Sequence, residues 1–263
     1  MKKFTIFGNP VSHSKSPLMH NLTFNGLGEN SKYSKTLLED GSLIKSKFKE
    51  LGLTGANITV PHKEEAFKVC DELDSFSKKV GVINTIVQKD GKLYGYNTDA
   101  PGFLKAVLLF NQDIKTVLII GAGGTAKAIS VVLRDEGYDV EILNRSSARL
   151  ESFKQKDFKT YTFDNFEPKK YDLIVNSTSA GLQDDYLPAP KEILEQVLSS
   201  AKSSIDVIYG KETPYLKLSK EYNLPTKDGS DMLLYQGIIA FEKFTNHKYS
   251  FDEIENFMKE AFI

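Results

Sequence analysis

Residues 117–126 read Val-Leu-Ile-Ile-Gly-Ala-Gly-Gly-Thr-Ala and lead from a continuous apolar run into a glycine-rich turn. The apolar run is typical of a strand that is buried on both faces of a parallel sheet. The turn fits the pattern G-x-G-x-x-G/A and opens a helical stretch. Its glycines let the backbone approach a pyrophosphate, which the free amides of a helix N-terminus can bind. The sequence therefore predicts a dinucleotide-binding turn formed by Gly121, Ala122, Gly123, Gly124, Thr125 and Ala126.

The residues that follow this turn continue to alternate strands with helices or loops. Further apolar strands are expected at 140–143, 172–175 and 205–209. Strands that alternate with helices favour a parallel sheet covered on both faces. This part of the chain, about 101–236, is predicted to be a Rossmann-type α/β domain.

The first hundred residues predict a second α/β domain. Helices are expected to begin at Ser16-Pro17 and after Asp99, and another to cover 64–73. The last part, from about 231, is helical, with a capping box that opens its final helix at Ser250. We expect 1–100 and about 237–263 to form one discontinuous domain. Its strands are predicted at 4–7, 55–60, 82–87 and 92–96, the last two joined by an Asp-Gly turn.

Composition excludes several classes of protein. The 263 residues carry a formal net charge of −1, and the lysines are scattered among acids, so the chain lacks the basic footprint of a nucleic-acid-binding protein. No run of about 18 apolar residues is present, which excludes a membrane-spanning helix. Cys70 is the only cysteine, as expected in the reducing cytoplasm. No cluster of ligating residues has the spacing of a metal site, so no metal is predicted.

The end of the second strand of the Rossmann-type domain indicates which dinucleotide is bound. NAD-binding proteins usually place an acidic residue there, but Glu141 lies early in the strand, and the tip reads Asn144-Arg145-Ser146. Arg149 follows closely, although a solvated helix face would also explain it. Guanidinium groups pair bidentately with phosphate. The chain has only three arginines, and two of them lie at this tip, so the pair favours NADP over NAD.

The first domain contains polar residues suited to a reacting site. Ser14 and Ser16 either cradle a carboxylate at a helix N-terminus or serve only as turn and N-cap residues. Lys63 is expected in the first turn of a helix, where the helix dipole disfavours a cation, so it is either a proton shuttle or, because lysines are abundant in this chain, a surface lysine. Asp99 is either a helix cap or the partner of Lys63. His13 and His62 are weaker acid–base candidates, since each sits in a tight turn.

From end to end the chain resembles the shikimate dehydrogenase family. The resemblance rests on the order and spacing of several motifs. They are Gly8-Asn9-Pro10 through Ser14-Lys15-Ser16-Pro17, Asn57 through Lys63, Asn84-Thr85, Gly95-Tyr96-Asn97-Thr98-Asp99, the turn at Gly121, Asn144-Arg145-Ser146, Asn176 through Gly181, and Met232-Leu233 with Gln236.

The resemblance implies two α/β domains, one binding substrate and one binding NADP, with the active site in the cleft between them. It implies the reversible NADPH-dependent reduction of 3-dehydroshikimate to shikimate in aromatic amino-acid biosynthesis, by a cytoplasmic monomer or homodimer. Lys63 and Asp99 would be the catalytic pair. The remaining roles that it implies are substrate binding by Ser14, Ser16, Thr59, Asn84, Tyr209 and Gln236, and cofactor binding by Asn144, Arg145, Ser146, Arg149 and Thr178.

The chain departs from the family pattern at two places. The family commonly has Thr where this chain has Ser146, which keeps a hydroxyl group, and Gly in the segment before Met232, where this chain has Ser230-Asp231. Three alternative functions stay open. One is a quinate/shikimate dehydrogenase with broader substrate or NAD use. Another is a non-catalytic dinucleotide sensor, which would be expected to lack Lys63 or Asp99. The third is a reductase that acts on an unrelated acid, which would keep the nucleotide site but lack the cradle of Ser14 and Ser16.

Overall fold

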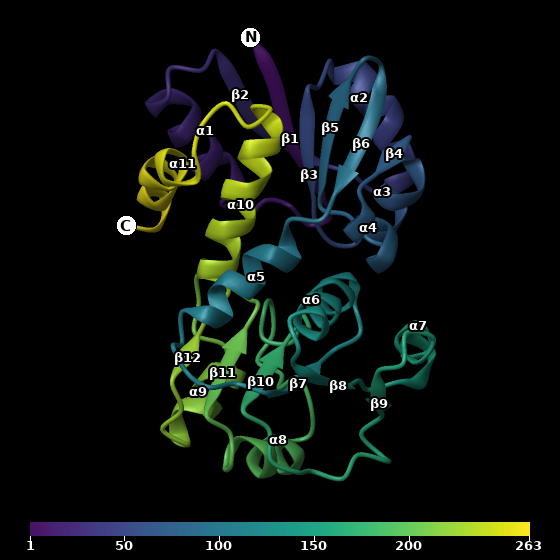
Figure 1. The fold of residues 1–263 in the computed structure, drawn as a ribbon, viewed down its shortest axis with the longest axis vertical. Helices are drawn as coiled ribbons and strands as arrows, with labels where there is room; N and C mark the ends of the chain where they lie inside the picture. Colours follow the sequence, from purple (N-terminus) through teal and green to yellow (C-terminus); the bar gives the residue numbers. More distant parts are fainter. The chain divides into compact units, whose positions relative to one another are not determined.

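The computed structural model describes residues 1–263 and divides the chain into two compact units. The first unit comprises Met1–Gly102 with Leu234–Ile263, and the second comprises Phe103–Leu233 (Figure 1). The sequence predicts domain boundaries near residues 100/101 and 236/237, whereas the structure places the boundaries between residues 102 and 103 and between residues 233 and 234. Gly102 and Gln236 pack closely within the first unit, because a Cβ atom added at Gly102 would lie 2.6 Å from the backbone nitrogen of Gln236.

Each unit contains one six-stranded sheet and its covering helices. The strands are β1 Lys2–Gly8, β2 Ser31–Leu37, β3 Gly55–Ile58, β4 Glu72–Leu73, β5 Thr85–Lys89, β6 Lys92–Tyr96, β7 Thr116–Ile120, β8 Asp139–Leu143, β9 Lys159–Tyr161, β10 Leu173–Asn176, β11 Ser203–Asp206 and β12 Thr226–Lys227. The α-helices are α1 Ser16–Gly26, α2 Ile44–Leu51, α3 Lys63–Val69, α4 Ser75–Val80, α5 Asp99–Leu108, α6 Gly124–Asp135, α7 Glu151–Lys154, α8 Lys191–Leu198, α9 Pro214–Glu221, α10 Ser230–Phe244 and α11 Phe251–Met258. Short 3₁₀ turns cover Gly41–Leu43, Ser147–Arg149 and Lys259–Phe262.

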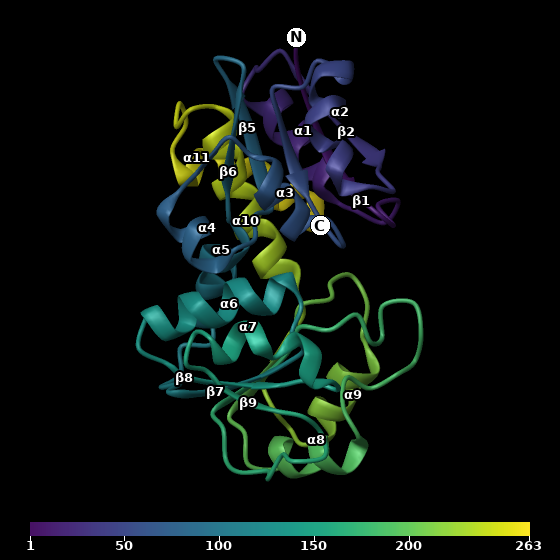
Figure 2. The same ribbon diagram turned by 90° about the vertical axis from the view of Figure 1, so that its right-hand side faces the viewer.

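The sheet of the second unit is parallel throughout, in the order β12-β11-β10-β7-β8-β9. Numbered within the unit and read from β9, this order is 3-2-1-4-5-6, the strand order of dinucleotide-binding sheets. Helices α8 and α9 pack their apolar residues on one face of the sheet, and α6 lies on the other face (Figure 2). The strand order reverses between β7 and β10, where such sheets bind their ligands at the carboxyl ends of the strands.

Asp172 links the amino ends of three of these strands, at the edge of the sheet opposite their carboxyl ends. Its Oδ2 atom accepts hydrogen bonds from the backbone amides of Lys115 at 2.9 Å and Thr116 at 3.0 Å, and its Oδ1 atom lies 2.9 Å from Lys202 Nζ. Burial disfavours the charged form, but the hydrogen bonds from Lys202 and from these amides outweigh it. The pKa of Asp172 is therefore held well below its usual value.

We expect Asp172→Asn to lower the free energy of unfolding at pH 7 by about 2–3 kcal/mol. A carboxyl group with a depressed folded-state pKa adds stability above its unfolded pKa, near 3.9, and loses this contribution as the pH falls toward the folded pKa. The difference between wild type and variant should therefore shrink below pH 4. Urea denaturation at pH 7 and at pH 3 measures it. Asp113→Asn, at an exposed carboxylate, is the control. Equal stability of Asp172→Asn and wild type at pH 7 would contradict this account.

The sheet of the first unit is mixed, in the order β2-β1-β3-β5-β6-β4. β1 pairs in parallel with β2 and β3, and β5 runs antiparallel to β3 and β6. The predicted hairpin is confirmed, because Asp90 and Gly91 join β5 to β6 with φ values of 51° and 75°. Side chains alternate across the pleat, so Phe7 joins the core under α2 and α3 while Phe4 faces α1 and α10.

The C-terminal helices of the first unit complete an aromatic core on the second face of its sheet. The Phe4 ring lies 4.8 Å from that of Phe244, and the Phe24 ring lies 4.7 Å from that of Phe241. The predicted capping box at Ser250 is confirmed, with both of its hydrogen bonds to Glu253 present. The C-terminal segment thus closes the core that the first hundred residues leave open on this face.

Several expected boundaries differ in the structure. The predicted helix 64–73 is wrong beyond Val69, because Glu72–Leu73 forms β4 and pairs with β6. Gly95 permits this approach, since an added Cβ atom there would meet Leu73 at 2.8 Å. Tertiary pairing thus overrides a local helical pattern. Three expected strands are also shifted, since they are observed at 85–89, 173–176 and 203–206.

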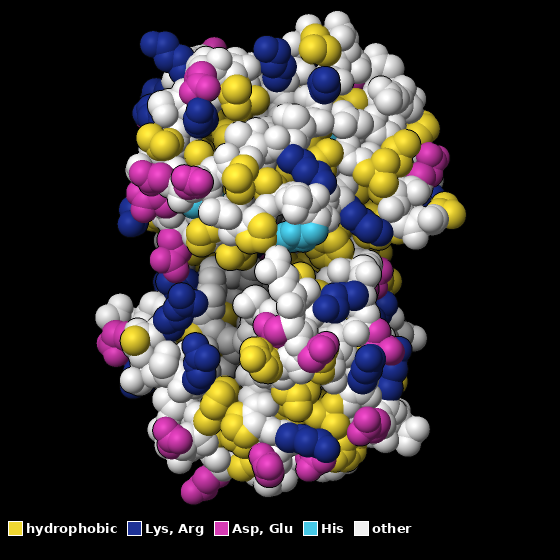
Figure 3. All heavy atoms as spheres, turned by 180° about the vertical axis from the view of Figure 1, so that it is seen from behind, with side chains coloured by type: hydrophobic (Ala, Val, Ile, Leu, Met, Phe, Trp, Pro, Cys, Tyr) yellow, Lys and Arg dark blue, Asp and Glu magenta, His cyan; other side chains and the backbone are white.

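The surface mixes charges of both signs. On the face drawn in Figure 3, lysine and arginine side chains are interspersed with aspartate and glutamate rather than gathered into a block of one sign. None of the helices is long and apolar enough to cross a membrane.

Candidate active site

The centre of the candidate site is an ion pair between Lys63 and Asp99. Lys63 begins α3 and Asp99 begins α5, so two helix starts bring together side chains 36 residues apart in sequence. Lys63 Nζ lies 2.5 Å from Asp99 Oδ2, and the two side chains are only 10% and 9% exposed. The pair is therefore largely withdrawn from solvent, unlike a surface lysine, and a lysine held in this way is suited to proton transfer.

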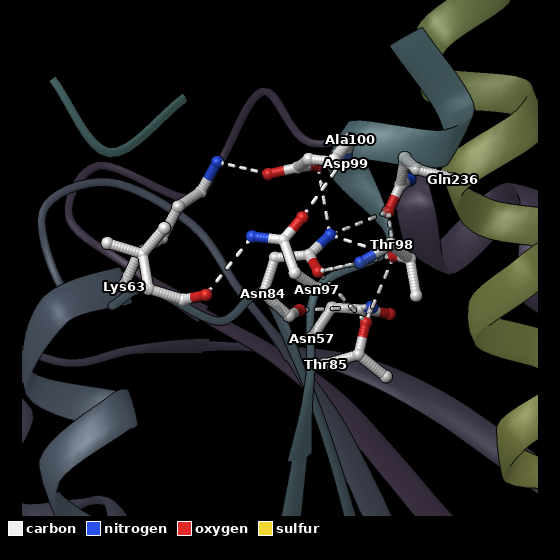
Figure 4. Close-up of polar contacts among 10 residues, drawn as sticks. Asn57, Lys63, Asn84, Thr85, Asn97, Thr98, Asp99, Ala100 and Gln236 are labelled. Carbon is white, nitrogen blue, oxygen red and sulfur yellow. Dashed lines mark hydrogen bonds and ion pairs between the residues drawn. The ribbon is translucent and has the colours of Figure 1, made fainter. Parts of the chain in front are cut away.

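A network of amides and hydroxyl groups fixes the carboxylate of this pair (Figure 4). Asn84 Nδ2 donates to Asp99 Oδ1 at 2.9 Å and to Thr98 Oγ1 at 2.9 Å, while Asn84 Oδ1 accepts from the Thr98 amide at 2.7 Å. Gln236 Oε1 lies 3.3 Å from Asn84 Nδ2, and it reaches the site from α10, 152 residues farther along the chain. Both carboxylate oxygens of Asp99 are therefore engaged, one by Asn84 and one by Lys63.

The capping role considered for Asp99 belongs to a neighbouring residue. Asn97 Oδ1 accepts the backbone amide of Ala100 at 3.1 Å, and Asn97 Nδ2 donates to the carbonyl of Val82 at 3.1 Å. Since Asn97 binds the free amide at the start of α5, the Asp99 carboxylate is left to contact Lys63 and Asn84.

The two serines of the predicted cradle are buried at the start of α1. The expectation that Ser16 is the N-cap of this helix is wrong, because Lys15 holds that position and Ser14 Oγ accepts the amide of Ser16 at 3.2 Å. The Ser14 hydroxyl proton is therefore free to be donated elsewhere.

The remaining candidate residues lie in different surroundings. Thr59 follows β3, and its side chain covers Gly8, where an added Cβ atom would lie 2.3 Å from Thr59 Cγ2. His62 is buried, with Nε2 2.6 Å from the carbonyl oxygen of Leu38, which indicates a structural contact. His13 is exposed. Tyr209, half-buried after β11, belongs to the second unit.

Several buried residues of the network are not among the predicted site residues. They are Tyr33, Asn57, Thr85, Asn97 and Thr98. The signal available in the sequence was a polar side chain within or just after a strand that otherwise buries apolar residues, because buried polar groups require hydrogen-bond partners. The sequence alone does not reveal which partners they have.

In the second unit, the glycine turn has the geometry that a dinucleotide requires. Gly121 has a φ of 111°, and a Cβ atom added there would lie 2.7 Å from Ser177 Oγ. Gly123 precedes α6 as its N-cap and provides no side-chain cap, so the first amides of this 12-residue helix are not bonded to a capping side chain. Thr178 lies beside the turn, with its Cγ2 atom 3.0 Å from the position of the added atom. These residues fit a bound pyrophosphate.

The tip of β8 fits the phosphate of NADP. Arg145 and Arg149 are exposed, and neither guanidinium is paired with a carboxylate. Asn144 Nδ2 donates to the carbonyl of Ser146 at 2.8 Å, which orders the turn between them. Glu141, the only acid in this strand beyond Asp139, is buried and bound to Tyr171 at 2.6 Å and to Lys169, so it is not available to a ribose.

Two family models match the chain. Residues 6–86 match the model described as the shikimate dehydrogenase substrate binding domain. Residues 106–200 match the model described as shikimate / quinate 5-dehydrogenase. The two matches fall in the first and the second unit, respectively.

Curated relatives and solved structures agree with these models. The chain is 42% identical over 96% of its length to the shikimate dehydrogenase (NADP(+)) of Helicobacter hepaticus, of which it covers 94%. It is 41% identical over its full length to the Helicobacter pylori protein of the same name, of which it covers 99%. A Thermus thermophilus structure described as shikimate 5-dehydrogenase in complex with NADP(H) and shikimate has a TM-score of 0.85 and 29% identity, covering 99% of this chain and 100% of that one. An Aquifex aeolicus shikimate dehydrogenase has a TM-score of 0.85 and 32% identity, covering 97% of both chains.

Proposed function

Because the chain belongs to the shikimate dehydrogenase family, we propose that it catalyses the reversible NADPH-dependent reduction of 3-dehydroshikimate to shikimate. The observation that supports this most directly is the buried Lys63–Asp99 pair held by Asn84 and Gln236. Reduction of a ring ketone requires a proton at the oxygen that becomes the alcohol, and this pair can supply one. The reaction belongs to aromatic amino-acid biosynthesis.

NADPH supplies the hydride when it is bound. The residues suited to hold it are the glycine turn from Gly121 to Ala126, Thr178 beside it, and Asn144, Arg145, Ser146 and Arg149 at the tip of β8. The first amides of α6 would face the pyrophosphate, and the two guanidiniums would bind the ribose phosphate.

The residues of the first unit move the proton and hold the substrate. Lys63 donates its Nζ proton to the developing alkoxide, and Asp99 keeps the ammonium in position and stabilises its charge; in the oxidative direction Lys63 takes the proton back. The hydroxyl groups of Ser14 and Ser16 bind the substrate carboxylate. Thr59, Asn84 and Gln236 bind the ring hydroxyls, and Tyr209 is proposed to assist with the carboxylate.

A matrix of initial rates tests this proposal, with purified protein offered shikimate or quinate together with NADP or NAD. We expect turnover mainly with shikimate and NADP, because the paired arginines favour a 2′-phosphate and Glu141 is engaged elsewhere. Comparable rates with quinate or with NAD would indicate the broader quinate/shikimate enzyme. No turnover with any pair would indicate the non-catalytic sensor, whose binding of NADP would persist.

We also propose that the enzyme is cytoplasmic, which its biosynthetic role and the single Cys70 support. We propose further that it acts as a monomer or homodimer. Its partners are the small-molecule substrate and NADP, with neither nucleic acid nor membrane involved. Light scattering coupled to size exclusion distinguishes the two oligomeric states.

A further inference from the structure

Tyr33, on β2, is a buried polar residue that the proposed mechanism does not use. It is 2% exposed, and its hydroxyl group donates to Asn57 Oδ1 at 2.7 Å. The ring of His20 stacks on it, with centroids 4.4 Å apart and planes 7° from parallel. Burial lowers the pKa of His20 to about 3, so this ring is neutral, and burial raises the pKa of Tyr33 well above its usual value. The tyrosine therefore keeps its proton as a hydrogen-bond donor.

The bond from Tyr33 anchors the amide oxygen of Asn57. Asn57 Nδ2, on the other side of the amide, donates to Thr85 Oγ1 at 3.0 Å and to the backbone carbonyl of Asn84 at 3.3 Å. Because that carbonyl can only accept, it fixes the orientation of the amide, and this orientation presents Oδ1 to the tyrosine hydroxyl. Without the hydroxyl group, Asn57 Oδ1 would lose a donor in a buried site, so Tyr33 contributes to holding the side chain in place.

The chain of hydrogen bonds continues from Thr85 to the ion pair. Thr85 Oγ1 lies 3.2 Å from Thr98 Oγ1 and 3.4 Å from Asn84 Oδ1, to which it donates. Asn84 Nδ2 then donates to Asp99 Oδ1. All these residues belong to the first unit and are buried. Buried side chains are thus hydrogen-bonded one to the next, from a tyrosine outside the predicted site to the carboxylate that holds Lys63.

We propose that Tyr33 is a positioning residue, which acts through Asn57 and Thr85 to hold Asn84, and with it the Lys63–Asp99 pair, in the geometry that proton transfer requires. The inference rests on the proposed function. Unlike a residue that only stabilises the fold, Tyr33 should affect the rate of the chemical step in molecules that are folded and saturated with substrate.

Tyr33→Phe tests this, because it removes the hydroxyl group and keeps the ring that stacks on His20. Single-turnover reduction of 3-dehydroshikimate, followed by the absorbance of NADPH, separates the rate constant of the reaction from the amplitude, which counts active molecules. We expect the rate constant at saturation to fall about tenfold, with the amplitude retained and the concentration of 3-dehydroshikimate that gives half of this rate constant changed less than about threefold. Tyr249→Phe is the matched control, because its hydroxyl contacts Glu29 and Leu27 in the same unit, away from this chain.

Four results would overturn the inference. A loss of amplitude with an unchanged rate constant would mean that Tyr33 only supports folding. A rise in the concentration of 3-dehydroshikimate that gives half of the maximal rate constant, with that rate constant unchanged, would mean that Tyr33 affects substrate binding and not the chemical step. The third result is an equal fall of the rate constant in Tyr249→Phe. If wild type shows no turnover, the proposed function fails and this inference fails with it; turnover by wild type together with an unchanged Tyr33→Phe overturns this inference alone.

Thr85→Val provides a second test, because it removes the hydroxyl group that connects Asn57 to Asn84. This test remains possible even if Tyr33→Phe does not fold. The same fall in the rate constant is expected, and an unchanged rate constant would contradict the chain. When both variants fold, the double variant should be no slower than the slower single one, because both changes break the same chain. A double variant slowed by the product of the two effects would show that the residues act independently.

Discussion

Lys63→Ala is expected to lower kcat for shikimate oxidation on the order of a thousandfold, while KM for shikimate changes less than about threefold. Lys63 Nζ is the proton-carrying group nearest Asp99, and the alanine side chain cannot take up the proton released when the alcohol is oxidised. The loss should therefore fall on the chemical step rather than on substrate binding. Steady-state rates at saturating NADP measure both constants.

Two further measurements make this result interpretable. Lys68→Ala removes a lysine of the same helix that is 67% exposed and pairs with Glu65, so its kinetics should match those of wild type. Removing Lys63 leaves the buried carboxylate of Asp99 without its cation, which costs stability, so the melting temperature of each variant must be recorded. A loss expressed only in KM would rule out an acid–base role and leave Lys63 as a binding residue.

The double substitution of Arg145 and Arg149 by alanine is expected to lower kcat/KM for NADP about a hundredfold, equivalent to the loss of two charge-assisted hydrogen bonds. The value for NAD should hardly change, because NAD lacks the 2′-phosphate that these side chains bind. The ratio of the two values, measured at constant ionic strength, therefore reports on this contact alone.

A neighbouring charge provides the control for this experiment. Lys154→Ala removes an exposed positive charge from α7, the helix that follows Arg149, and should leave the ratio unchanged. Raising the salt concentration should weaken NADP binding to wild type more than to the double variant. An unchanged preference for NADP in the double variant would show that the tip of β8 does not select the cofactor.

Local sequence patterns determined those parts of the fold whose geometry is set within a few residues. The turn at Asp90-Gly91 needs positive φ at both positions, and the box at Ser250 needs a glutamate three residues later. The apolar run, glycine turn and helix start from Val117 to Ala126 are marked by residues that are adjacent in the sequence. The nucleotide-binding half could be predicted for this reason.

Only the tertiary structure decided the contacts within the candidate site. Lys63 and Asp99 could be named as candidates, but a 2.5 Å bond across 36 residues depends on how α3 and α5 pack. Asn97, rather than Asp99, caps α5 because Val82 holds its amide in place.

The same limit explains the residues that sequence reasoning missed. Tyr33 lies in an edge strand whose residues give no local sign of a bond to Asn57, 24 positions away. The segment at Glu72 reads as helix until its pairing with β6 is known. A local pattern reports how the backbone turns, whereas the partners of a buried polar group depend on which distant strands and helices the core brings together.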